Sequence, residues 1–129
     1  MAVRQVRIGS PRLRGEGLRI GVPVRPPRGV KKTEYASRNY YDLWLPILSP
    51  SPDLVKAARR SRADGPWKTI RRRFRAEIAR RPGAEAVLTL LAALSHQTSF
   101  SIACYCPDGE NCHRLLLLEL LRERGAAIS

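Results

Sequence analysis

Three cysteines, a histidine and an arginine lie close together near the end of this 129-residue chain. They fall in the stretch IACYCPDGENCHR as Cys104, Cys106, Cys112, His113 and Arg114. Thiolate and imidazole groups bind metals, so the Cys-x-Cys-x5-Cys-His pattern indicates a candidate site for zinc or iron. The spacing weakens this hypothesis, because zinc sites usually take their ligands from two well-separated pairs. A metal- or thiol-based sensor is therefore one alternative, and for Cys104 alone a small buried strand residue is the simpler interpretation.

The same stretch also has the features of an anion site. If a helix begins here, Cys112, His113 and Arg114 occupy its first three positions, where backbone N–H groups lack helical partners. Such a helix start favours an anion such as phosphate, which an arginine can hold through two parallel hydrogen bonds. Thiolate phosphatase chemistry is disfavoured, because Asp108 and Glu110 in the preceding loop would repel phosphate.

The charge of the chain points to an anionic partner. Its formal net charge is +13, from 24 Lys and Arg against 11 Asp and Glu. The excess is concentrated in residues 1–38, with ten basic and two acidic residues, and in residues 56–81, with eleven and two. A field this positive suits a nucleotide, a phosphometabolite or nucleic acid. Recognition motifs for nucleic acid are missing, so any nucleic-acid binding is expected to be nonspecific. A nonspecific nucleic-acid-binding module built on residues 56–81 is therefore a further alternative. The simpler interpretation is that the basic residues of these helices are exposed to solvent.

Apolar periodicity and turn residues predict the elements that position these groups. Extended segments are expected at residues 3–8, 18–24, 39–48 and 99–106, and helices from residue 51 or 52 and at residues 66–81, 85–94 and 111–125. In the second segment, Pro23 indicates a sheet edge or a strand end. The helix over 85–94 is apolar on nearly all sides, so we expect it to be buried. Glu77, beside the apolar stripe of the preceding helix, is expected to be structural.

This order of elements predicts one α/β domain over residues 1–129. We expect a three-layer arrangement in which a small mixed sheet is flanked by about four helices. Functional sites in such folds lie beyond the carboxyl ends of strands, where residues 106–113 would sit. No export signal or apolar span is visible, so we expect no membrane association, a cytoplasmic location and reduced cysteines.

Several stretches resemble a known family. LRIGVPVRPPRGVKK, WLPILSPSPDL and WKTIRRRFRAEIA are similar to signature stretches of the YeaO-like proteins, domain of unknown function family 488, and the strand before CHR resembles the end of the broader family. The resemblance implies a compact intracellular α/β domain of bacteria or archaea, without a particular reaction. The family-like residues are Arg19, Pro27, Arg28, Gly29, Lys31, Lys32, Trp44, Pro50, Ser51, Cys112, His113 and Arg114. The chain departs from the pattern at Pro23 and Val24, where the family has an Asp-Arg pair.

Together these observations favour one functional hypothesis. We expect a phosphate-bearing or other anionic small molecule to bind a basic cleft between Arg28, Lys31, Lys32 and the 106–114 loop, which contains His113 and Arg114. The sequence leaves open whether the protein is an enzyme.

Overall fold

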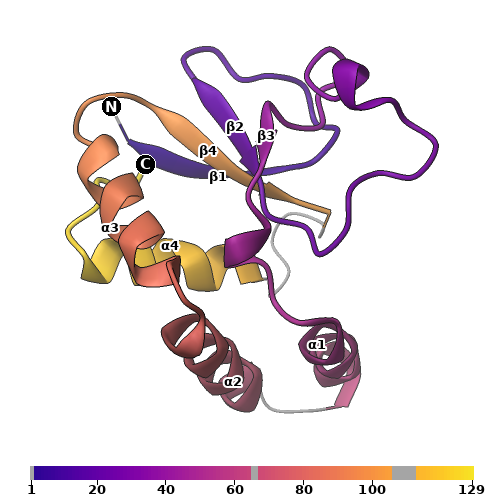
Figure 1. The fold of residues 1–129 in the computed structure, drawn as a ribbon, viewed down its shortest axis with the longest axis vertical. Coiled ribbons are helices and arrows are strands. Elements are labelled where there is room, and N and C mark those ends of the chain that lie inside the picture. Colours follow the sequence, from indigo (N-terminus) through magenta and orange to yellow (C-terminus); the bar gives the residue numbers. More distant parts are fainter. Residues whose placement is uncertain (1, 65–66, 106–112) are drawn as a thin grey trace.

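The structure is a computed structural model that describes residues 2–64, 67–105 and 113–129 (Figure 1). Its strands are β1 (Val3–Arg7), β2 (Leu18–Gly21), β3 (Leu43–Trp44) and β4 (Phe100–Cys104). Its α-helices are α1 (Pro52–Asp64), α2 (Trp67–Arg80), α3 (Ala84–Leu94) and α4 (His113–Glu123). Two short 3-10 helices are η1 (Lys32–Glu34) and η2 (Pro46–Leu48). Cys106 and Cys112 lie outside the described residues.

The strands form one sheet in the order β1-β4-β2-β3. All three neighbouring pairs are parallel, so the predicted α/β class is confirmed, while the sheet of the described residues is parallel and not mixed. Strand β2 lies between β4 and β3, so Pro23 marks a strand end and not a sheet edge. Because the strands are parallel, their carboxyl ends lie at the same edge of the sheet.

The α-helices lie on one face of the sheet (Figure 1). Helix α4 packs against β1 and β4, α3 and α2 pack against α4, and α1 packs against α2. Phe100, Ile102 and Cys104 alternate along β4 into the core that these helices cover. The intervening Ala103 faces a smaller cluster around Tyr41. The second face is covered by a mostly irregular segment that contains η1, and not by α-helices.

Helix α3 is less buried than its composition predicts. Leu88 is fully buried, whereas the side chain of Leu90 is 62% exposed. The helix contacts α2 and α4 on one side and is open on the other, so the prediction of a helix buried all round is wrong. An apolar composition shows that a helix can be buried, but not how many neighbours it has.

The start of α1 is fixed in the way its sequence predicts. The Ser51 hydroxyl accepts a hydrogen bond from the Leu54 N–H at 3.2 Å and donates one to Glu77 at 2.6 Å. The Ser51 N–H donates to the same carboxylate at 2.9 Å. Ser51 is therefore an N-cap, and Glu77 has the structural role expected of it, since it joins α2 to the start of α1.

A buried ion pair anchors the second face of the sheet. The Arg19 guanidinium donates to the two Glu16 carboxylate oxygens at 2.7 and 2.8 Å, and Ser101 donates to Glu16 at 2.8 Å. Burial alone would raise the pKa of Glu16, but the hydrogen bonds from Arg19, the Leu13 N–H and Ser101 outweigh it and lower the pKa to about 2. Arg19 also donates to the Ser10 and Asn39 carbonyls. This one side chain thus ties two loops to the sheet.

No helix in the described part of the chain is both long enough and apolar enough to span a membrane.

Candidate functional site

A cavity of about 560 Å³ opens beyond the carboxyl ends of β2 and β4. Its walls come from the segment after β2, the first turns of α1, one side of α2, the end of β4 and the start of α4. The lining residues are Pro23, Val24, Arg25, Arg28, Pro50, Pro52, Leu54, Val55, Lys56, Ala58, Trp67, Ile70, Phe74, Cys104, Tyr105, His113 and Leu116. The cavity is located where ligand sites occur in parallel α/β sheets, and its volume is in the range of small-molecule pockets.

The part of the cavity wall that the structure describes contains cations and no acidic side chain. The cations are Arg25, Arg28 and Lys56, and no Asp or Glu stands among the described lining residues. Within the described ranges, none of the three makes an ion pair or a side-chain hydrogen bond. All three are exposed. Their charge is therefore available to a ligand, and a described lining without carboxylates favours an anion.

Several arginines away from the cavity are already paired. Arg71 and Arg75 contact Glu119 at 2.9 and 3.2 Å, which joins α2 to α4. Arg81 donates to the Ile47 carbonyl at 2.7 Å. Positive charge at these positions supports the packing of helices, whereas the charge at the cavity does not.

The floor of the cavity is apolar. Leu54 and Phe74 are 1% and 0% exposed, and Ile70 is 5% exposed. Phe74 and Ile70 belong to the apolar stripe of α2, and Trp67, at the first residue of that helix, is half-buried. Tyr105 follows β4 and is 44% exposed. The cavity thus combines an apolar floor, two partly exposed aromatic rings and cationic groups.

His113 is the first residue of α4, and its ring orientation is fixed. Its Nε2 lies 2.9 Å from the Val22 carbonyl oxygen. A carbonyl only accepts, so Nε2 carries a proton and donates it to Val22. The Phe74 ring lies beside the imidazole, with centroids 6.1 Å apart.

The structure brings together part of the predicted anion site. Arg28 and His113 line the cavity. Lys31 and Lys32, at the start of η1, are exposed and are not among its lining residues. Arg114 is 1% exposed, and its Nη1 donates to the Val6 carbonyl at 2.6 Å, so its guanidinium supports β1.

The predicted metal site is described only in part. Cys104 is buried at the end of β4 and lines the cavity with His113. The described residues contain no group of three His, Cys, Asp or Glu side chains that could hold a metal ion. Cys106 and Cys112, which the hypothesis also needs, lie outside the described residues. The zinc or iron site therefore stays a prediction.

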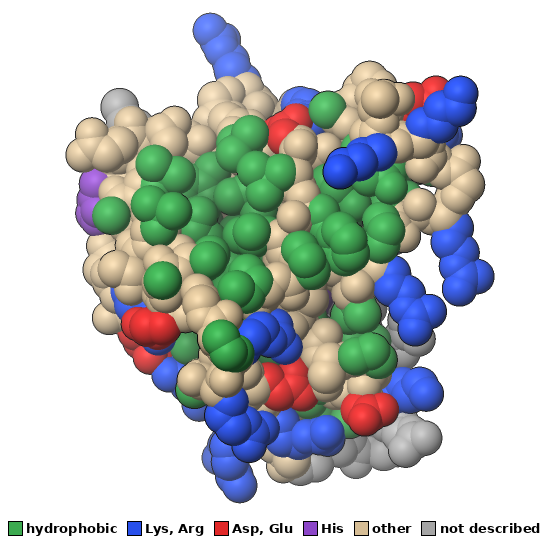
Figure 2. All heavy atoms as spheres, in the orientation of Figure 1, with side chains coloured by type: hydrophobic (Ala, Val, Ile, Leu, Met, Phe, Trp, Pro, Cys, Tyr) green, Lys and Arg blue, Asp and Glu red, His purple; other side chains and the backbone are tan. Residues whose placement is uncertain are grey.

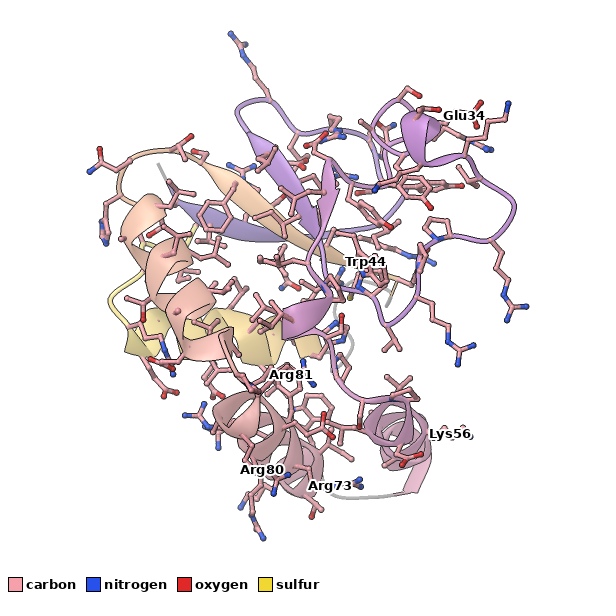
Figure 3. All side chains as sticks on the ribbon, in the orientation of Figure 1. Glu34, Trp44, Lys56, Arg73, Arg80 and Arg81 are labelled. Carbon is pink, nitrogen blue, oxygen red and sulfur yellow. The ribbon has the colours of Figure 1, made fainter. Side chains whose placement is uncertain are left out.

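Sequence reasoning missed several cavity residues. Arg25 belongs to the basic loop, but nothing in the pattern distinguishes it from neighbouring cations. Lys56 is on α1 (Figure 3), and only the fold brings it to the cavity that Arg28 also lines. Trp67 is the first residue of an apolar stripe, and such a stripe predicts a core residue, not a residue that lines a cavity. Tyr105 carries none.

The fold and the cavity define a small α/β domain with a basic, partly aromatic cavity beyond the ends of a parallel sheet. A family model described as the active DUF488-N3 subclade matches residues 3–125. The chain belongs to this DUF488 family, which confirms the resemblance seen in its sequence. The comparisons with curated proteins and with solved structures give no match.

The family-like residues have identifiable places in the fold. Arg19 holds the buried ion pair, and the Trp44 indole donates to the Pro23 carbonyl at 2.8 Å. Pro50 lines the cavity. The departure from the YeaO-like pattern also lies here, because Pro23 and Val24 are both lining residues. This chain therefore has apolar side chains in a wall where that pattern has a charged pair.

Proposed function

We propose that the cavity binds a phosphate-bearing or other anionic small molecule. The observation that carries this proposal is the set of three cations without ion-pair partners, Arg25, Arg28 and Lys56, in a wall with no carboxylate among its described residues. Folded proteins pair or solvate their cations, and a concentration of unpaired charge beside a concave apolar surface favours a ligand of opposite sign.

Phosphate suits these residues better than a simple halide. Arginine presents a planar fork of donors that matches two oxygens of a phosphate, and two such side chains are present. Leu54, Ile70 and Phe74 keep water from the floor of the cavity. A charge-assisted hydrogen bond made next to such a surface is stronger than one made in open solvent.

The family description supports chemistry at this cavity as well as binding. The matching subclade is described as active. Among the described lining residues, His113 is the side chain suited to proton transfer near neutral pH, and its hydrogen bond to Val22 fixes the orientation of its ring. We therefore propose His113 as the residue that would move a proton on a bound anion.

The test is a calorimetric titration with inorganic pyrophosphate and with ribose 5-phosphate at low salt. We expect Arg28→Gln to weaken binding about 10- to 100-fold, because a hydrogen bond to a charged group contributes about 1.5–3 kcal/mol. Lys31→Gln is the matched control, because it removes the same charge three residues away from a side chain that does not line the cavity. Equal weakening by both variants would mean that net charge, and not the cavity, attracts the ligand.

A second candidate, nonspecific nucleic-acid binding, is favoured by the outer side of α2. Lys68, Arg72, Arg73 and Arg80 have no ion-pair partner within the described residues. Figure 2 shows Lys and Arg side chains gathered over this end of the molecule, and Arg73 and Arg80 project from α2 away from the sheet in Figure 3. Binding to a DNA duplex that weakens steeply with salt, and that Arg72→Gln with Arg73→Gln reduces, would support it.

A further inference from the structure

We propose that the anion bound in the cavity is a nucleotide, with its base against the aromatic side chains and its phosphate at the cations. This inference rests on the proposed function and deepens it by naming the class of ligand. It depends on a feature that a phosphate alone does not explain, namely the accessible rings of Trp67 and Tyr105 in the same cavity as Arg25, Arg28 and Lys56.

The two rings differ from the buried aromatic residue below them. Phe74 is 0% exposed and packs in the core beside His113, so its position is explained by folding. Trp67 is only half-buried and Tyr105 is 44% exposed, although both border a hollow lined by apolar side chains. Flat aromatic surfaces left accessible in a concave site are suited to stacking on a planar ring, because every base presents a π-face.

Hydrogen-bonding capacity at these rings supports a polar heterocycle in preference to a plain hydrocarbon. The Trp44 indole N–H donates to the Pro23 carbonyl at 2.8 Å. The Trp67 indole N–H makes no such bond within residues 2–64, 67–105 and 113–129, nor does the Tyr105 hydroxyl. A base offers acceptors to such donors, whereas an alkyl chain does not.

The cations and rings also come from different elements, which suits a ligand with two chemically distinct ends. Arg25 and Arg28 lie on the loop after β2, Trp67 begins α2, and Tyr105 follows β4. A free phosphate would engage the cations and leave the aromatic surface hydrated. A sugar phosphate would do the same, because its ring is neither flat nor apolar. The volume of about 560 Å³ is in the range that encloses a drug-sized ligand.

The experiment compares AMP and UMP with ribose 5-phosphate and hexyl phosphate, by calorimetry on the full chain. We expect both nucleotides to bind at least about 10-fold more tightly than ribose 5-phosphate or hexyl phosphate, which is the effect of stacking one base on an aromatic side chain. Trp67→Leu should abolish this advantage and leave the affinity for ribose 5-phosphate within about twofold. Trp67→Phe, which keeps a ring, should retain most of it.

The outcomes separate the two proposals. If ribose 5-phosphate binds through Arg28 but the nucleotides bind no more tightly, the nucleotide proposal is overturned and the proposed function stands. Hexyl phosphate that binds as tightly as AMP would also overturn it, in favour of an aliphatic phosphate. If none of the four compounds binds, the proposed function fails and this inference fails with it. Thermal unfolding of both Trp67 variants would show that any lost binding does not come from lost folding.

Discussion

Replacing Glu16 by Gln should destabilise the protein strongly and in a pH-dependent manner. The carboxylate is 2% exposed and accepts hydrogen bonds from Arg19, from Ser101 and from the Leu13 N–H. The Gln amide has one acceptor oxygen and one donor nitrogen, so it cannot accept the two parallel hydrogen bonds that Arg19 donates to the carboxylate. Arg19, itself 0% exposed, would then be a buried charge without its counter-ion.

The magnitude follows from the pKa of the carboxyl group. Lowering the pKa of Glu16 from its ordinary 4.5 to about 2 corresponds to roughly 3 kcal/mol of folding stability at neutral pH. Because the pKa is lower in the folded chain, this stability is fully present above about pH 4.5. It is lost as the pH falls from about 4.5 to about 2, since the folded protein must then take up the proton.

Urea unfolding of the wild type and Glu16→Gln, from pH 7 down to pH 2.5, measures this contribution. The difference in the free energy of unfolding should be about 3 kcal/mol at pH 7 and should shrink steadily below pH 4.5. Glu123→Gln is the control, because it breaks an exposed ion pair with Arg75 and should change stability little. A difference below about 1 kcal/mol at pH 7, or one that does not depend on pH, would refute the reasoning.

Four further substitutions test the packing and the cap of α1. Gly21→Ala should lower the free energy of unfolding by at least about 1–3 kcal/mol, because the added Cβ would lie 2.3 Å from the Tyr41 ring. Thermal unfolding measures this loss, and an unchanged melting temperature would contradict the contact. Ser51→Ala should cost about 1–2 kcal/mol by chemical unfolding, and a smaller loss would mean that the cap contributes little. Leu88→Ala should lower the free energy of unfolding by about 2–5 kcal/mol, whereas Leu90→Ala should lower it by less than about 1 kcal/mol, because Leu88 is buried and Leu90 is exposed. Equal losses would show that α3 is covered on both sides.

The elements of the fold could be predicted because local patterns determine them. The start of α1 is indicated by the adjacent Ser51 and Pro52. Helix α2 is indicated by an apolar stripe that begins at Trp67 and recurs every three or four residues. The direction of the strands could not be predicted in this way. Strands β2 and β3 have four and two residues, and such short segments do not reveal whether a neighbour is parallel or antiparallel.

The candidate site was only half predictable, for two physical reasons. Arg28 and Lys56 are far apart in the sequence, and only the arrangement of α1 beside the loop after β2 places both at one cavity. Arg114 follows His113 directly, but neighbouring helical positions point in directions about 100° apart. As a result, His113 lines the cavity, while Arg114 is buried against the Val6 carbonyl.

The central claim is that the cavity beyond β2 and β4 binds a phosphate-bearing anion. It is tested most directly by following the backbone amide resonances of the labelled protein during a titration with ribose 5-phosphate. The account predicts that the largest shifts occur at Arg25, Arg28, Lys56 and His113, and that they saturate together with one dissociation constant. Shifts centred on the outer side of α2, or shifts spread over all exposed cations without saturation, would contradict it.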